Sequence, residues 1–316
     1  MAKLIILCGL PGSGKSSYAE CIQDNSYVFT DDSDSEVVIH SSDAIRGELF
    51  GDPSFQGDNS KVFETLHKRV REDLKAGKTV IYDATNITRK ARKGAIACAH
   101  PTNDTVECHI VWAEPEECIR RDSLRDRKVG PEVIDKMLRR WQSPWFDEGF
   151  DEIELVCYQP DFNNIEYIAD RVDAMHISHD NPHHTLGVWE HCKAAKEHIK
   201  AIVENNKPDF PYYSASLIMA ATWHDIGKPY TKFFKPGEDI AHYYDHHCVG
   251  GYLAYGFFLN PGAYSVSIPE LYKACLVSWL ISNHMEPFFE SSYYKTLNPQ
   301  WKWYLEVLHE ADVNAH

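Results

Sequence analysis

Short apolar runs alternate with amphipathic stretches over the first half of the chain. The apolar runs are rich in β-branched residues, as is typical of buried strands, and the stretches between them repeat apolar residues at helical spacing. This alternation predicts an α/β domain with a parallel sheet flanked by helices. We expect strands over residues 3–8, 36–42, 79–85 and 105–113, and helices over 15–24, 62–75, 89–99, 115–127 and from 131 onward.

From about residue 175 the strand pattern fades and long helical stretches follow, separated by Pro and Gly. This pattern predicts an all-α second domain, with helices near 184–204, 213–224, 246–258, 268–283 and 299–310. We therefore expect an α/β domain over residues 1–150, a polar linker over 151–175 and an all-α domain over 176–316.

Composition supports two folded domains. The 316 residues are 43% hydrophobic and 25% charged, without a low-complexity run or an internal repeat. No run of 18 apolar residues and no signal-peptide pattern occurs, so we expect no membrane segment. Nine cysteines without a CxxC pair favour reduced thiols in a cytoplasmic, reducing compartment.

Charge and histidine are unevenly distributed. The net charge is −15, and residues 151–316 hold 11 Lys and Arg against 22 Asp and Glu. The same half holds 13 of the 17 histidines. An acidic, histidine-rich half favours metal binding over broad adhesion to nucleic acid, so any polynucleotide would depend on local arginine clusters.

The first strand runs into a glycine-rich phosphate-binding motif. Residues 9–16, GLPGSGKS, fit GxxxxGK[ST] at every position, between a predicted strand and a predicted helix. Backbone N–H groups and the helix N-terminus bind phosphate oxygens, Lys15 reaches the β- and γ-phosphates, and Ser16 binds Mg²⁺. The motif predicts a site for ATP and Mg²⁺ formed by Gly9, Pro11, Gly12, Ser13, Gly14, Lys15, Ser16 and Ser17.

An acceptor site is predicted beside this loop. Asp43 follows the second strand, where its carboxylate could take a proton from an attacking hydroxyl, and Arg46 lies three residues on, suited to a substrate phosphate. A helix-capping aspartate with a surface arginine is the alternative. Thr85, Asn86 and Arg89 follow the third strand and are further candidates for acceptor binding, although a solvated helix start would give the same pattern.

Arginines after the fourth strand predict a lid. In the stretch RRDSLRDR, Arg121 and Arg125 lie one turn apart on one face of the predicted helix, and could close over the transferring phosphate. A solvated arginine-rich helix is the alternative.

Together these motifs resemble the polynucleotide 5′-kinase family of nucleic-acid repair enzymes. The resemblance covers roughly residues 3–141, through GLPGSGKSS, SSDAIR, DATN and RRDSLRDRKVGPEVI. It implies that Asp43 is the general base, that Arg46 contacts the acceptor phosphate, and that Arg121 and Arg125 stabilise the transition state. The acidic segment 31–36 departs from the family pattern.

The second half carries histidines and aspartates in an order that predicts a metal site. An adjacent His-Asp at a helix end, with further His and Asp on separate helices, can direct ligands into one bundle interior. Asp225 could bridge two metal ions. A lone histidine is more often a core or surface residue, but six candidates occur in sequence: His191, His224, Asp225, His246, His284 and Asp312.

This half resembles the HD phosphohydrolase superfamily over roughly residues 176–316, through HHTLGVWEH, WHDIGKP, HYYDHHCVGG, ISNHMEP and LHEADVNA. The resemblance implies an all-helical fold with ligands His191, His224, Asp225 and Asp312, completed by His246 and His284. His242 and His247 are alternatives to His246. Lys228 and His184 resemble phosphate-contacting positions. The expected metal is a divalent transition ion, Mn²⁺, Co²⁺, Ni²⁺, Fe²⁺ or Zn²⁺.

Three functions follow from these patterns. The first is an end-healing enzyme for RNA or DNA, phage- or bacteria-encoded, which phosphorylates 5′-OH ends and removes 3′-phosphate or 2′,3′-cyclic phosphate before a separate ligase acts. The second is a nucleoside or small-metabolite kinase fused to a nucleotide phosphohydrolase, which the acidic charge favours. The third is a kinase joined to a metal-bound module that senses nucleotides.

Overall fold

The structure is a computed structural model of the whole chain, and it forms two compact units. The first consists mainly of Met1–Met137 and Pro144–Pro160, and the second of Leu138–Ser143, Asp161–Gly262 and Ser267–His316. The residues described are 2–24, 35–55, 57–99, 104–159, 161–182, 185–206, 211–259 and 266–315. His184 and residues 31–34 of the acidic segment lie outside them.

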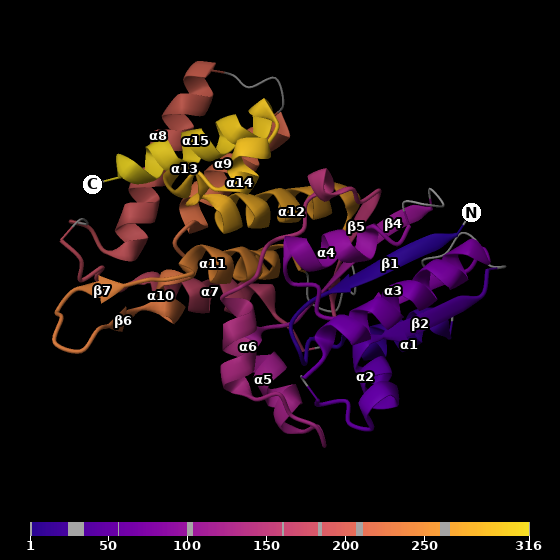
Figure 1. Cartoon of the computed structure of the whole chain (residues 1–316). Helices are drawn as coiled ribbons and strands as arrows, with labels where there is room; N and C mark the ends of the chain where they lie inside the picture. The colour runs from indigo at the N-terminus through magenta and orange to yellow at the C-terminus, as the bar shows by residue number, and fades with distance from the viewer. Residues whose placement is uncertain are drawn as a thin grey trace. The chain divides into compact units, whose positions relative to one another are not determined.

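A five-stranded parallel sheet forms the centre of the first unit (Figure 1). The strand order is β2-β3-β1-β4-β5, so the phosphate-binding loop after β1 leaves the middle of the sheet. The three central strands are almost wholly buried, as their continuous apolar runs predict. The strands are β1 Lys3–Cys8, β2 Val37–Ser41, β3 Thr79–Asp83, β4 Thr105–Trp112 and β5 Glu152–Cys157.

Helices pack on the sheet through their apolar stripes. Tyr18, Ala19 and Ile22 of α1 join Ile5 and Leu7 of β1 in one buried cluster. On α3, four buried residues recur at every fourth position, close to the helical period of a core-facing stripe. The helices are α1 Lys15–Gln23, α2 Ser42–Phe50, α3 Asn59–Lys75, α4 Arg89–Ile96, α5 Pro115–Ser123 and α6 Pro131–Leu138, with a short 3₁₀ turn η1 Phe146–Glu148.

The segment expected to be a linker is structured. Residues 151–175 contain β5, which pairs with β4 at the edge of the sheet, and a twelve-residue helix, α7 (Asn164–Met175), in the second unit. Polar residues on the exposed face of this edge strand hid the alternation from sequence reasoning. The segment Leu138–Ser143 also belongs to the second unit, where Trp141 is fully buried against Tyr252 and Tyr255.

The second unit is largely helical, as expected, with one small exception. A two-stranded antiparallel hairpin, β6 (Phe233–Phe234) and β7 (Ala241–His242), departs from the all-α prediction. The five predicted helices are present with shifted ends, as α8 Val188–Asn206, α9 Pro211–Trp223, α11 His246–Ala254 with the 3₁₀ turn η2 Tyr255–Phe258, α12 Ile268–Asn283 and α15 Pro299–Val313. Three short helices were not predicted: α10 Lys228–Thr231, α13 Glu286–Phe289 and α14 Ser292–Thr296.

Candidate functional site

The phosphate-binding loop has a backbone path that requires glycine. Gly12 and Gly14 have φ angles of 82° and 103°, in the left-handed region that side chains rarely adopt. A Cβ on Gly12 would lie 2.3 Å from the carbonyl oxygen of Cys118. Gly14 is the N-cap of α1, so the loop leads directly into the helix N-terminus, as a phosphate site requires.

Lys15 and Ser16 lie at the start of α1 beside the end of β3. Lys15 Nζ donates to the carbonyl oxygens of Gly9 and Leu10, at 3.0 and 2.7 Å. Burial lowers the pKa of Lys15, and the nearby carboxylate of Asp83 opposes this shift. Ser16 Oγ donates to Asp83 Oδ2 at 3.1 Å. A hydroxyl and a carboxylate are the protein ligands that a nucleotide-bound Mg²⁺ takes in P-loop enzymes, so these residues fit that ion.

Asp83 is therefore a candidate ligand of Mg²⁺ that we did not assign from sequence. The signal was present, because the apolar run TVIY ends in an acidic residue at the carboxyl end of a strand. Sequence reasoning assigned residues 83–86 to binding of the acceptor strand instead.

One cavity of about 240 Å³ joins the loop to the predicted acceptor residues. Asp43 and Arg46, near the start of α2, line it together with Lys15, Ser16 and Thr85. Pro11, Gly12, Asp83, Arg125 and Arg127 also face it. Residues that bind phosphate and residues suited to an acceptor hydroxyl thus share one space.

Both carboxylate oxygens of Asp43 are bound by arginine. Arg46 Nη1 lies 2.7 Å from Asp43 Oδ1, and Arg127 Nη1 lies 2.9 Å from Oδ2. Arg46 is further held by Asn59, whose side-chain oxygen accepts from Nη2 at 2.9 Å. Neither Arg127 nor Asn59 was assigned from sequence, because only the fold brings them to Asp43.

Two predicted residues are engaged elsewhere. Asn86 is buried and donates to the carbonyl of Leu7 at 2.7 Å, which ties the end of β3 to β1. Arg89 forms an ion pair with Glu148 at 4.0 Å. Neither Asn86 nor Arg89 lines the cavity.

Arg121 and Arg125 do not share a helix face. Helix α5 ends at Ser123, where Asp122 accepts hydrogen bonds from the backbone N–H groups of Val129 and Gly130. Arg125 lies beyond the helix and faces the cavity.

Arg121 lies against the phosphate-binding loop. Its guanidinium donates to the carbonyls of Gly12 and Ser13, at 3.4 and 3.3 Å, and its Nε donates to Glu117 at 2.6 Å.

Of the loop residues predicted to bind the cofactor, Ser13 is buried and Ser17 is exposed on the first turn of α1.

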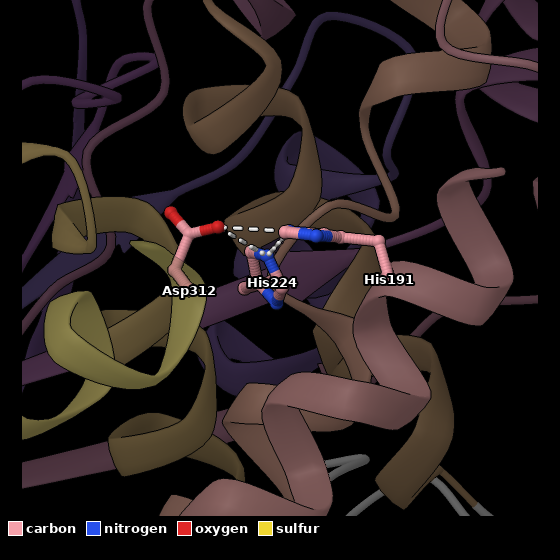
Figure 2. Close-up of side chains that lie close together, drawn as sticks. All are labelled: His191, His224 and Asp312. Carbon is pink, nitrogen blue, oxygen red and sulfur yellow. Dashed lines mark hydrogen bonds and ion pairs between the residues drawn. The ribbon is translucent and has the colours of Figure 1, made fainter. Parts of the chain in front are cut away.

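The second unit gathers six predicted ligands into one buried cluster, the histidine cluster. His191 lies on α8, His224 and Asp225 follow α9, His246 begins α11, His284 follows α12 and Asp312 lies on α15. Figure 2 shows the side chains of His191, His224 and Asp312 pointing toward one another. Residues far apart in the sequence are thus brought together by five separate helices.

Each of the four imidazoles is fixed by a backbone carbonyl. The Nδ1 atoms of the four histidines lie 2.8 Å from the carbonyl oxygens of Ala315, Ala221, Tyr243 and Ile281. A carbonyl only accepts, so every Nδ1 carries a proton, and each ring in its neutral form presents the lone pair of Nε2 to the cluster.

The Nε2 atoms face one another in two pairs. His191 and His224 lie 3.2 Å apart, and His246 and His284 also lie 3.2 Å apart, measured between Nε2 atoms. Two lone pairs at that distance repel unless a proton or a metal cation lies between them. This donor set therefore fits a divalent cation at each pair.

Asp225 lies between the two pairs. Its Oδ2 is 3.5 Å from His224 Nε2, and its Oδ1 is 3.4 Å from His246 Nε2. Asp312 Oδ1 completes the first group, 2.8 Å from His191 Nε2. The carboxylate of Asp225 is thus placed to bridge two cations.

The electrostatics of the cluster favour a cation. Burial opposes ionisation of Asp225 and Asp312, but Lys228 and His224 hold the pKa of Asp225 well below its usual range. His224 and a hydrogen bond from His191 do the same for the pKa of Asp312. In turn, Cys192 and the two carboxylates raise the pKa of His224 well above its usual value. Burial lowers the pKa of His246 to about 4, although Asp225 opposes the shift. Two ionised carboxylates and a neutral imidazole are the forms in which these groups bind metal.

Lys228 and His179 flank Asp225. Lys228 Nζ lies 2.7 Å from Asp225 Oδ2 and 3.1 Å from His179 Nε2. His179 is buried, and its Nδ1 donates to the carbonyl of Leu186 at 2.7 Å. Sequence reasoning chose His184, which lies outside the described residues, and missed His179, because nothing in the local pattern separates these neighbouring histidines.

The alternatives to His246 are placed differently. His247 stacks near Phe289, with ring centroids 6.4 Å apart, and His242 lies 3.0 Å from Glu238 at the hairpin. Of the three candidates, His246 is the one whose Nε2 lies beside both Asp225 and His284.

Comparison with known proteins gives matches to about half of the chain. The family described as AAA domain (AAA_33) matches residues 4–144. A bifunctional polynucleotide phosphatase/kinase of Schizosaccharomyces pombe is 26% identical over 163 residues, which are 50% of this chain and 34% of the relative. A shikimate kinase of Caldicellulosiruptor saccharolyticus is 21% identical over 186 residues, 57% of this chain and 98% of the relative. The chain thus spans about a third of the phosphatase/kinase.

Two solved structures were also matched. The Pnkp1/Rnl/Hen1 RNA repair complex aligns with a TM-score of 0.37 and 24% identity, over 43% of this chain and 42% of that chain. The APS kinase CysC of Mycobacterium tuberculosis aligns with a TM-score of 0.37 and 19% identity, over 54% and 96%.

Among the described helices, none has both the length and the apolar character needed to cross a bilayer. The parallel sheet, the glycine loop and the sequence comparisons all indicate a P-loop domain in the first unit. The N-terminal part of this chain is a P-loop domain of the kinase type, similar in sequence to part of a polynucleotide phosphatase/kinase.

Proposed function

We propose that this protein heals broken nucleic-acid strands, with one site for each end. The first unit transfers phosphate from ATP to a 5′-OH end, and the second unit removes a 3′-phosphate or 2′,3′-cyclic phosphate. The observation that carries the proposal is the shared cavity in which Asp43 and Arg46 face Lys15 and Ser16.

The kinase reaction requires a base beside the bound ATP. The carboxylate of Asp43 takes the proton of the attacking hydroxyl, and Arg46 binds a phosphate of the acceptor strand. Arg125 faces the cavity and offsets charge on the transferring phosphate, while Lys15 holds the β- and γ-phosphates. Ser16 and Asp83 would hold Mg²⁺, which neutralises charge on the phosphates.

The hydrolase reaction uses the histidine cluster as an HD-type site. Two divalent cations held by the four histidines, Asp225 and Asp312 would supply Lewis-acid activation of a phosphate ester. Lys228 lies against Asp225, where its ammonium group can bind a phosphate oxygen of the substrate. The carbonyls behind each Nδ1 keep the imidazoles oriented, which preserves the ligand set between turnovers.

The two activities produce a 5′-phosphate and a 3′-hydroxyl, which are the ends that a ligase joins. We therefore propose that a separate nucleic-acid ligase acts on the product.

Two oligonucleotides, each with only one end that requires repair, test the proposal. An oligonucleotide with a 5′-OH should gain phosphate from ATP with the wild type and with Asp225→Asn, but not with Lys15→Ala or Asp43→Asn. An oligonucleotide with a 3′-phosphate should lose it with the wild type and with Asp43→Asn, but not with Asp225→Asn. If Asp43→Asn or Asp225→Asn lost both activities or kept both, the assignment of one activity to each site would be refuted.

The net charge of −15 favours a second candidate, a metabolite kinase joined to a nucleotide phosphohydrolase. Rates with a nucleoside and with an oligonucleotide as acceptor decide between the two. End healing predicts a higher kcat/KM for the oligonucleotide, and the metabolic function predicts the reverse.

A further inference from the structure

A cavity of about 580 Å³ opens beside the histidine cluster, within the volume range of small-ligand sites. It is lined by residues at and just before the start of α11, namely Tyr243, Tyr244, Asp245, His246 and His247, and by Met285, Phe288 and Phe289 around α13. His246 belongs both to this lining and to the ligand set. The cavity therefore leads to the second pair of imidazoles.

The aromatic rings at this cavity are unusually exposed. Phe288, Phe289 and Tyr244 have relative accessibilities of 68%, 57% and 56%. Exposed apolar rings side by side at the entrance of a polar site are characteristic of a binding surface, since such rings are otherwise buried.

The exposed rings are ordered into two adjoining groups. Phe288 and Phe289 lie 5.4 Å apart between centroids, with His247 6.4 Å beyond Phe289. Tyr244 lies 5.3 Å from Phe233 of the hairpin, and Lys235 Nζ lies 6.0 Å from the centre of the Tyr244 ring. Rings interleaved with a lysine match the alternation of bases and phosphates along a single strand.

We propose that Tyr244, Phe288 and Phe289 form a platform on which the last bases of a single-stranded nucleic acid stack, while its 3′-terminal phosphate enters the histidine cluster. This rests on the proposed function and specifies its substrate: the second unit acts on unpaired polynucleotide ends. A base stacks on an aromatic ring whatever its identity, so the platform does not select a sequence. Lys235 then lies where the backbone phosphates pass.

Binding of the full-length protein to two labelled oligonucleotides tests the platform. Both are about ten nucleotides long and end in a 3′-phosphate. One of them lacks the bases of its last few nucleotides. The two strands therefore carry the same charge, but only the complete strand can stack on the rings. Wild-type protein should bind the complete strand about tenfold more tightly in fluorescence anisotropy. The double variant Phe288→Ala/Phe289→Ala and the variant Tyr244→Ala should each reduce this difference, whereas Ile268→Ala, an exposed residue of α12, should not.

Equal affinity for the two strands, or an unchanged difference in both platform variants, would overturn the platform. The circular dichroism spectrum of each variant establishes whether it folds, and Phe288→Leu provides a second, milder loss of the ring. Release of the 3′-phosphate is measured separately. A wild type that binds in a base-dependent manner but releases no phosphate would keep the platform and refute the proposed hydrolase.

Discussion

His246 and His284 face each other through their Nε2 atoms at 3.2 Å, while the Nδ1 atom of each lies 2.8 Å from a backbone carbonyl. Because each carbonyl fixes the proton on Nδ1, the facing Nε2 atoms present lone pairs when the rings are neutral. The same arrangement recurs for His191 and His224. Two such pairs around one carboxylate form a donor set that fits two cations.

Metal content should depend on Asp225 more than on any other ligand. Because its two oxygens face both imidazole pairs, we expect Asp225→Asn to lose metal from both groups, whereas Asp312→Asn affects only the group with His191 and His224. Mass spectrometric metal analysis measures this. His198→Gln, at an exposed histidine of α8, serves as the control and should retain the wild-type content. Equal losses in the two aspartate variants would contradict the bridging position.

Asp43→Asn should lower kcat of the kinase by about 10²- to 10⁴-fold, because an amide cannot take the proton of the attacking hydroxyl. Affinity for ATP should change little, since Lys15 and the loop are intact. Steady-state kinetics and nucleotide binding test the two effects separately. Asp126→Asn, an exposed neighbour of Arg127, should behave as the wild type. A large rise in the Kd for ATP in Asp43→Asn would count against its role as a base.

A buried ion pair should stabilise the first unit. Arg92 is fully buried and bound by both oxygens of Glu148, at 2.6 and 2.8 Å. Glu148→Gln leaves this guanidinium without a counter-charge, so we expect a loss of about 3–5 kcal/mol in the free energy of unfolding. Urea unfolding measures the loss. The transition that belongs to the first unit is the one that ATP shifts to higher urea concentration, because ATP binds only the folded unit. A loss below about 1 kcal/mol, as at surface pairs, would show that solvent reaches the site.

Glu154 should make the first unit less stable at alkaline pH. Burial, with Glu152 and Glu107 nearby, raises the pKa of Glu154 to about 7. Between the usual pKa of a glutamate and about 7 the folded state holds more protons than the unfolded state, so stability falls as pH rises through this window. Glu154→Gln should therefore raise the unfolding temperature at pH 8 and change it little at pH 5. The same gain at both pH values would exclude titration of Glu154 as the cause.

Sequence patterns predicted much of the fold and most of the candidate ligands, for identifiable reasons. The central strands are continuous apolar runs, and the glycine loop needs particular residues at fixed spacing. Six ligand positions could be chosen because histidine and aspartate bind metal wherever helices bring them together. The cluster that holds them, with its paired Nε2 atoms, is a property of the tertiary structure alone.

The parts that sequence missed depend on partners far along the chain. Arg127 meets Asp43, and Asn86 turns inward to Leu7, because of packing that no local pattern encodes. Strand β5 lies at a sheet edge with polar residues outward, so its sequence resembled a linker. Helix α5 ends at Ser123 because Asp122 binds the following backbone, which moves Arg125 off the helix.

Circularisation of one oligonucleotide with a 5′-OH and a 3′-phosphate tests the central claim most directly. After treatment with this protein, ATP, Mg²⁺ and Mn²⁺, an added ligase that requires a 5′-phosphate and a 3′-OH should close the strand. Asp43→Asn and Asp225→Asn should each give no circle, and a mixture of the two variants should restore it, because each retains one site. A wild type that yields no circle, or two variants that fail to complement each other, would contradict a protein with one site for each end.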